Sequence, residues 1–158
     1  MPPTIFITSA EGIGKSTLIP ILKGMLPGCS IIDFDNLLRP YDGSDTWYGE
    51  TLDVCMLVID EQGERPVIVV GLVHPDSVIA RQHRLGENYF VLLDCSEEER
   101  AMRLRSRGVE QDVVSDTDNL YRLRNHFRRG LANHFVVNTD ELSPEMVAER
   151  IVDLLKAL

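Results

Sequence analysis

The sequence predicts an α/β fold with three layers (α/β/α), in which a five-stranded parallel sheet carries helices on both faces. Two observations predict it. Short apolar or β-branched runs alternate with segments whose apolar residues recur every three to four positions. The most apolar run, residues 66–72, lacks polar alternation, as expected of a strand buried on both faces. The length of 158 residues fits one domain covering residues 1–158.

The five expected strands share β-branched and aromatic residues bounded by glycine, proline or polar residues. They are residues 4–8, 30–34, 66–72, 89–93 and 135–137. Between them the spacing of apolar residues predicts helices. The first helix contains Pro20, which should bend it because proline has no N–H to donate to the preceding turn.

Local signals mark where other helices begin. Pro75 can open a short helix that runs to about residue 85. Ser96 with Glu99 three positions later forms a capping box, which predicts a helix N-terminus. Ser143 and Pro144 start the last helix.

The composition excludes several classes of protein. The 16 basic and 25 acidic side chains give a net charge of −9, which disfavours a general binder of nucleic acid polymers. No apolar run is long enough to span a bilayer, and the N-terminus lacks the basic region of a signal peptide. The three cysteines have no paired spacing, which indicates a reducing compartment and favours a cytoplasmic location.

Positive charge gathers in one part of this acidic chain. Eight of the thirteen arginines and only four acids lie within residues 100–129. Such a basic segment on an acidic protein favours a site for a small anion.

The strongest functional signal lies between the first strand and the first helix. The octapeptide SAEGIGKS, residues 9–16, matches the phosphate-binding pattern G-x-x-x-x-G-K-S/T except that Ser9 replaces the first glycine. Glycines let the backbone amides approach a phosphate, Lys15 supplies a positive charge, and the Ser16 hydroxyl suits Mg²⁺. A chance glycine-rich turn is the alternative. The residues expected to hold the nucleotide are Gly12, Ile13, Gly14, Lys15, Ser16 and Thr17.

With this loop and the predicted layout, nearly the whole chain resembles the P-loop small-molecule and nucleotide kinases. The likeness is to shikimate kinase, gluconate kinase, chloramphenicol phosphotransferase and the nucleoside monophosphate kinases. The resemblance implies the strand order 2-3-1-4-5, with ATP and Mg²⁺ as cofactors. It also implies a small-molecule acceptor and a monomer or homodimer.

An Asp-Phe-Asp sequence closes the second predicted strand, where shikimate kinase has an Asp-x-Asp pair. By this resemblance Asp33 helps to hold Mg²⁺, and Asp35 binds the acceptor hydroxyl or acts as base. Either carboxylate lies at the end of a parallel strand, where ligands bind in such sheets. Either one can instead cap the following turn.

The arginine-rich segment corresponds to the lid of these kinases, at about residues 103–119. Arg103 matches the arginine that stacks on adenine, and Arg107 is expected to stabilise the transferred phosphoryl group. Residues 108–118 read as a mobile loop. Arg124, on the next helix, is the candidate for an acceptor-binding arginine. Each of these arginines can also be an ordinary solvated or paired side chain.

The sequence departs from shikimate kinase on the acceptor side. It lacks the run of glycines after the third strand and has no arginine between Arg39 and Arg65, so shikimate is not the expected acceptor. Aromatic residues take that side, and they either stack a ligand or belong to the core. They are Tyr41, Trp47 and Tyr48. His74 is either a structural histidine or part of the site.

The sequence therefore predicts an ATP-dependent phosphotransferase that moves the γ-phosphoryl group to a nucleoside, a nucleotide or another hydroxyl- or phosphate-bearing metabolite. Its catalytic residues would be Lys15, Asp33, Asp35 and Arg107, and its metal-binding residues Ser16 and Asp33. The alternatives are an NTP hydrolase and a non-catalytic nucleotide-binding module. A hydrolase would favour an acid after Asp94, where Cys95 stands. A non-catalytic module would need neither the aspartates nor the lid arginines.

Overall fold

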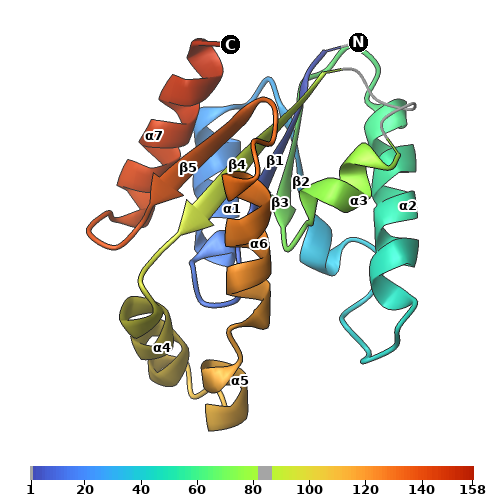
Figure 1. Cartoon of the computed structure of the whole chain (residues 1–158). Coiled ribbons are helices and arrows are strands. Elements are labelled where there is room, and N and C mark those ends of the chain that lie inside the picture. The colour runs from blue at the N-terminus through green and yellow to red at the C-terminus, as the bar shows by residue number, and fades with distance from the viewer. Residues whose placement is uncertain (1, 82–86) are drawn as a thin grey trace.

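A five-stranded parallel sheet forms the centre of the protein, whose computed structural model describes residues 2–81 and 87–158 (Figure 1). The strands lie in the order β2-β3-β1-β4-β5, which confirms the order implied by the resemblance. They are β1 (Thr4–Thr8), β2 (Ser30–Asp33), β3 (Val67–Gly71), β4 (Asn88–Asp94) and β5 (His134–Asn138). Each expected strand is present, with ends that differ by one residue at most.

The central strand β1 pairs with β3 on one side and with β4 on the other. The chain therefore leaves β1 at the point where the strand order changes direction. In open parallel sheets a ligand crevice forms at such a point, beyond the carboxyl ends of the strands. The loop that follows β1 lies at this crevice.

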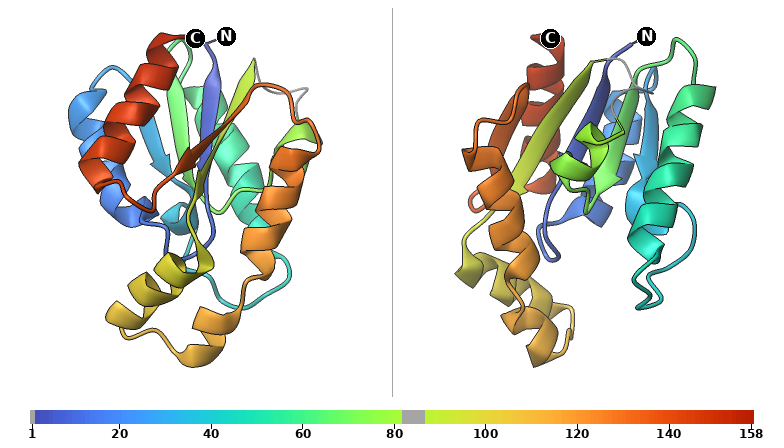
Figure 2. Two further views of the ribbon diagram at one scale, coloured as in Figure 1. Left: turned by 60° about the vertical axis from the view of Figure 1, so that its left-hand side comes forward. Right: turned by 45° about the vertical axis from the view of Figure 1, so that its right-hand side comes forward.

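Helices cover both faces of the sheet, as Figure 2 shows from two sides. They are α1 (Lys15–Met25), α2 (Trp47–Glu61), α3 (Pro75–Ile79), α4 (Glu97–Ser106), α5 (Gln111–Ser115), α6 (Asp118–Arg128) and α7 (Pro144–Lys156), with a 3₁₀ turn η1 (Phe34–Asn36). Helices α4 and α5 project beyond the carboxyl ends of the strands. Among the described residues no helix is both long and apolar enough to cross a membrane.

Alternate residues of each strand pack against different helices. On β1, Ile5 and Ile7 face the core shared with α1 and α7, whereas Phe6 faces the core shared with α2, α3 and α6. Because both faces are covered, every residue of β1 and β3 is buried. This two-sided burial explains the continuous apolar runs of the sequence.

Helix α1 continues through Pro20, whose ring is exposed. Two local expectations need correction. The helix that begins at Pro75 ends at Ile79, well short of residue 85, and residues 82–86 lie outside the described part. Residues 108–118 are not simply a loop, because they contain α5 with the buried Val114. The N-cap at Ser96 is confirmed, because its hydroxyl accepts a hydrogen bond from the Glu99 N–H. The reciprocal half of the capping box is not formed, since the Ser96 N–H donates to Asp140 Oδ1 instead of to Glu99.

Candidate functional site

The loop between β1 and α1 turns through two glycines in the left-handed backbone region. Gly12 has φ of +83° and Gly14 has φ of +102°, conformations that a residue with a Cβ rarely adopts. Helix α1 follows with no acidic residue in its first turn, so no carboxylate of its own compensates the positive end of the helix dipole. Curled backbone and helix N-terminus together suit an anion.

Ser9, at the position where the motif has glycine, is fully buried. Among the described residues its hydroxyl has no hydrogen-bond partner, but its backbone carbonyl accepts a hydrogen bond from Lys15 Nζ at 2.9 Å. The serine therefore fits inside the turn and leaves the lysine anchored to the loop.

Lys15 also pairs with a carboxylate of η1, the turn that follows β2. Its Nζ lies 3.2 Å from Asp35 Oδ2, and the lysine side chain is only 12% exposed. The other oxygen, Asp35 Oδ1, accepts a hydrogen bond from the Leu72 N–H at 3.0 Å. Asp35 is thus fixed between the loop after β3 and the loop of residues 9–16, the phosphate loop, named for the sequence pattern that it matches.

Gly71, the last residue of β3, makes room for this arrangement. A Cβ at Gly71 would lie 2.6 Å from Phe34 Cβ and 3.0 Å from Asp35 Oδ1. Phe34 is fully buried and cannot move aside freely. The glycine is therefore required by the close approach of η1, which carries Asp35.

Asp33 lies at the end of β2, and its described contact is with the following turn. Its Oδ2 accepts a hydrogen bond from Asn36 Nδ2 at 2.9 Å. Ser16 lies in the first turn of α1, next to Lys15. Within residues 2–81 and 87–158 no three His, Cys, Asp or Glu side chains are grouped to hold a metal ion by themselves.

Arg103 of α4 connects the phosphate loop to the segment after β5. Its guanidinium donates to the Ile13 carbonyl at 3.2 Å and to the Thr139 carbonyl at 3.0 Å. Glu99, one turn earlier on α4, accepts from Arg103 Nε at 3.0 Å. These bonds bring the expected adenine-stacking arginine to the edge of the loop.

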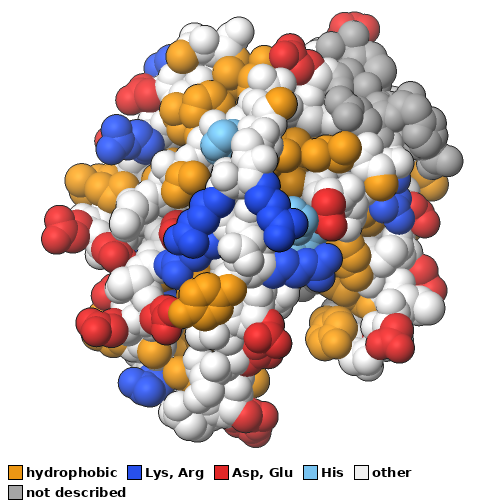
Figure 3. Space-filling model, viewed as in Figure 1, with side chains coloured by type: hydrophobic (Ala, Val, Ile, Leu, Met, Phe, Trp, Pro, Cys, Tyr) orange, Lys and Arg blue, Asp and Glu red, His pale blue; other side chains and the backbone are white. Residues whose placement is uncertain are grey.

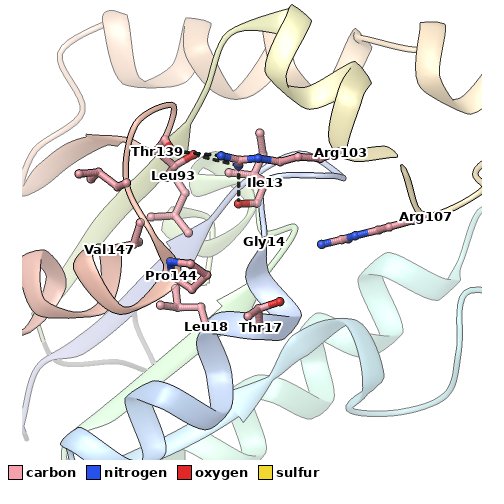
Figure 4. A pocket seen from close by; sticks show the side chains of 11 residues that line it. Ile13, Gly14, Thr17, Leu18, Leu93, Arg103, Arg107, Thr139, Pro144 and Val147 are labelled. Carbon is pink, nitrogen blue, oxygen red and sulfur yellow. Dashed lines mark hydrogen bonds between the residues drawn. The ribbon is translucent and has the colours of Figure 1, made fainter. Parts of the chain in front are cut away.

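A cavity of about 170 Å³ opens between α1, α4 and the segment after β5 (Figure 4). Apolar side chains line much of its wall, and they are Ile13, Leu18, Leu93, Leu142, Pro144 and Val147. Its polar rim includes Thr17, Arg103, Arg107 and Thr139. Arg107, just after α4, extends toward Gly14 and Thr17. A mostly apolar slot beside a phosphate loop suits a flat aromatic ring.

Two other arginines of the basic segment have structural partners. Arg124 donates from Nε to both carboxylate oxygens of Asp94, at 3.0 and 3.1 Å, and from Nη2 to the Cys95 carbonyl at 2.7 Å. These contacts join α6 to the end of β4, so its guanidinium is already engaged. Arg100 is 1% exposed and bonds to three backbone carbonyls. The sequence pattern gave Arg100 no such role.

His74 lies buried in the loop after β3, beside the crevice. Its backbone N–H donates to the Tyr48 hydroxyl at 2.9 Å, and the centroids of the two rings are 5.5 Å apart. Its Nδ1 has no partner among the described residues. Burial, together with the nearby Arg122, lowers the pKa of His74 to about 4. The imidazole is therefore neutral at physiological pH and is available as a hydrogen-bonding group, not as a cation.

The aromatic residues of the acceptor side divide into core and surface. Trp47 is buried and donates from its indole N–H to the Arg39 carbonyl at 2.9 Å, and Tyr48 packs against Phe34. Tyr41 is 69% exposed and meets the edge of the Trp47 ring. Trp47 is thus a core residue and Tyr48 lies half-buried against the core, whereas Tyr41 can still contact a ligand.

The outer face of α6 carries a group of basic side chains, visible as the blue area at the centre of Figure 3. An open, shallow pocket lies among these side chains, and the residues that line it are Asp118, Tyr121, Arg122, Asn125, His126 and Arg129. Arg122 and His126 reach toward Asp76 of α3, at 3.9 and 3.6 Å. Part of this charge is therefore balanced across the gap between α6 and α3.

Solved structures resemble this chain over nearly its whole length. The tunicamycin resistance protein of Deinococcus radiodurans matches 98% of the chain and 96% of its own, with a TM-score of 0.70 and 19% identity. Shikimate kinase from Aquifex aeolicus has the same coverages, a TM-score of 0.67 and 18% identity. Thymidylate kinase from Candida albicans matches 99% of this chain and 92% of its own, with a TM-score of 0.64 and 13% identity.

By sequence, no protein-family model and no curated protein matches the chain. The structural likeness, the strand order and the loop after β1 agree with one another. The chain has the fold of the P-loop kinases.

Proposed function

We propose that this protein is a phosphotransferase that moves the γ-phosphoryl group of ATP to a hydroxyl or phosphate group of a small organic acceptor. The observation that carries the proposal is the placement of Lys15. Its ammonium group is held between the Ser9 carbonyl and the Asp35 carboxylate, at the edge of an anion-binding loop. A cation and a carboxylate at one point are what phosphoryl transfer to a hydroxyl requires.

The residues present fit ATP. The positive-φ turns at Gly12 and Gly14 and the uncompensated N-terminus of α1 suit a polyphosphate. The adjoining cavity offers apolar walls for the base, with Arg103 at its edge. The triphosphate would therefore lie along residues 12–17, with the base between α1 and the segment after β5.

The residues also fit Mg²⁺, in the manner of a cation held mainly by the nucleotide. The Ser16 hydroxyl would supply one oxygen ligand, and Asp33 would contribute through water. When bound, Mg²⁺ neutralises charge on the phosphate oxygens.

In the proposed reaction, the acceptor oxygen forms a bond to the γ-phosphorus while the bond from that phosphorus to the β–γ bridging oxygen breaks. ADP leaves, and the proton of an acceptor hydroxyl passes to a carboxylate. The contacts favour Asp35 for this proton, because it already lies beside Lys15. Lys15 and Arg107 would stabilise the charge on the transferred group.

The acceptor would bind on the side of the crevice that contains Asp35, His74 and Tyr41. The described side chains there offer hydrogen bonds and an aromatic surface. This supports an acceptor recognised through hydroxyl groups and a ring face.

The test follows ATP and phosphorylated products, by mass spectrometry, across a mixed panel of nucleosides, nucleotides, sugars and other hydroxyl-bearing metabolites. The wild type should form a phosphorylated organic product, and Lys15→Met should not. Lys23→Met, which removes a lysine of the same helix in its last turn, is the matched control and should retain activity. ADP and inorganic phosphate without an organic product would indicate a hydrolase. Nucleotide binding without turnover would indicate a binding module.

A further inference from the structure

Helix α4 packs directly against the outer side of the phosphate loop. Arg100, which is 1% exposed, donates from Nε to the Glu11 carbonyl at 3.0 Å. Its other two nitrogens donate to the Val114 carbonyl at 2.9 Å and to the Asp116 carbonyl at 2.8 Å. One buried guanidinium thus joins the phosphate loop to the carboxyl end of α5, at Val114, and to Asp116 just after that helix.

A second arginine of α4 repeats this contact two residues later in the loop. Arg103 donates to the Ile13 carbonyl at 3.2 Å. Between the two bonds, a Cβ on Gly12 would lie only 2.8 Å from Leu104 Cγ. The loop therefore lies against α4 from Glu11 to Ile13.

These contacts fix the direction of two peptide groups. A trans peptide is planar, so its N–H points opposite to its C=O. The Glu11 carbonyl shares its peptide with the Gly12 N–H, and the Ile13 carbonyl shares its peptide with the Gly14 N–H. Because both carbonyls point toward α4, both N–H groups point away from it. A guanidinium on a carbonyl also polarises that peptide and makes its N–H a stronger donor.

The side chain of Glu11 adds a lateral connection. Its Oε2 lies 3.6 Å from Arg100 Nη2, and its Oε1 accepts from Asn119 Nδ2 at 3.2 Å. The outer side of the loop is thereby connected to α4 and to the first turn of α6. The buried charge of Arg100 is thus compensated by three backbone carbonyls and by the Glu11 carboxylate, which explains why an arginine is tolerated there.

We propose that Arg100 is a positioning residue that orients the amides of the phosphate loop for polyphosphate binding, although it does not itself contact the ligand. The inference rests on the proposed function for the identity of the ligand. It goes beyond that function by assigning the loop's binding strength to a side chain buried behind it. Through its bonds to the Val114 and Asp116 carbonyls, the same residue couples the orientation of the loop amides to the position of α5.

The experiment measures binding of inorganic tripolyphosphate by calorimetry, at a temperature where each variant is folded. Arg100→Met removes all three bonds, whereas Arg100→Lys keeps the charge and one short-reach donor. We expect at least about tenfold weaker binding for Arg100→Met and a smaller loss for Arg100→Lys. Arg65→Met is the matched control, because Arg65 also donates to two backbone carbonyls, those of Pro27 and Gly28, away from the loop. It should bind as the wild type does.

A second measurement does not depend on a ligand. In ¹⁵N NMR spectra of the free protein, Arg100→Lys should shift the Gly12 amide resonance, whereas Arg65→Met should not. If Arg100→Met does not fold, Arg100→Lys carries both measurements. A lower melting temperature with unchanged tripolyphosphate binding and an unshifted Gly12 amide would reduce Arg100 to a structural residue and overturn the proposal. If the wild type binds neither tripolyphosphate nor ATP, the proposed function fails, and the NMR result still decides the positioning role.

Discussion

Replacing Gly71 with alanine tests how tightly the strand end and the turn that carries Asp35 are packed. The new Cβ would lie 2.6 Å from Phe34 Cβ, and ordinary contact requires a separation larger by about 0.8 Å. Phe34 is fully buried and meets the rings of Trp47 and Tyr48, at 6.2 and 5.8 Å between centroids. The chain must therefore shift rather than a side chain swing away.

Such overpacking costs about 1–3 kcal/mol, so we expect the free energy of unfolding of Gly71→Ala to fall by that amount. Gly24→Ala is the control, because a Cβ at Gly24, inside α1, meets no atom within 4 Å. There alanine should raise the stability by about 0.5–1 kcal/mol, since glycine is a poor helix former. Opposite signs are thus expected for the same chemical change at two glycines.

The assay is urea unfolding followed by circular dichroism, with turnover measured alongside on the acceptor found by the metabolite panel. The Cβ would also approach Asp35 Oδ1 to 3.0 Å, so the carboxylate should move. A displacement approaching 1 Å at a reacting group lowers turnover by about 10- to 100-fold. Gly71→Ala with wild-type stability would refute the packing argument. A destabilised variant with full turnover would refute the role given to Asp35.

Three further predictions each concern a single side chain. His74 has a pKa of about 4 in the folded protein and about 6.5 when unfolded, so the free energy of unfolding should fall as the pH drops from 6.5 toward 4. At pH 5 the loss should be about 2 kcal/mol. In urea unfolding measured across this pH range, His74→Phe should flatten the profile. Arg107→Ala should lower kcat by about 100-fold with little change in the Kd for ATP, and an equal loss in both would mean that Arg107 only binds the nucleotide. Arg124→Met should lower the free energy of unfolding by about 2 kcal/mol, because the Asp94 carboxylate and the Cys95 carbonyl lose their partner. The double variant Arg124→Met/Asp94→Asn should lose less free energy than the sum of the losses of the two single variants.

The sheet and the phosphate loop were predictable because each leaves a local trace in the sequence. Strand β3 is buried on both faces, which selects an uninterrupted apolar run. The loop needs glycine at positions 12 and 14, where φ is positive. The cap at Ser96 involves residues three apart, so a short pattern identifies it.

Other features depend on contacts between residues far apart in the chain, and no local pattern reveals them. Arg100 lies among polar helical residues and reads as exposed, as arginines usually are. Its partner Glu11 is 89 positions away. Asp35 and Asp33 are alike in sequence, and only the fold shows that Asp35 meets Lys15 while Asp33 meets Asn36. Helix α5 has five residues, too few for a clear periodicity.

The ion pair between Arg124 and Asp94 limits how this protein can open and close. It fastens α6 to a strand end, and Arg103 fastens α4 to the segment after β5 through Thr139. Both helices that flank α5 are therefore bonded to the carboxyl edge of the sheet. Arg100 of α4 also holds the Val114 and Asp116 carbonyls, so a flap of α5 about residues 107–110 would have to break these two hydrogen bonds before the segment could open.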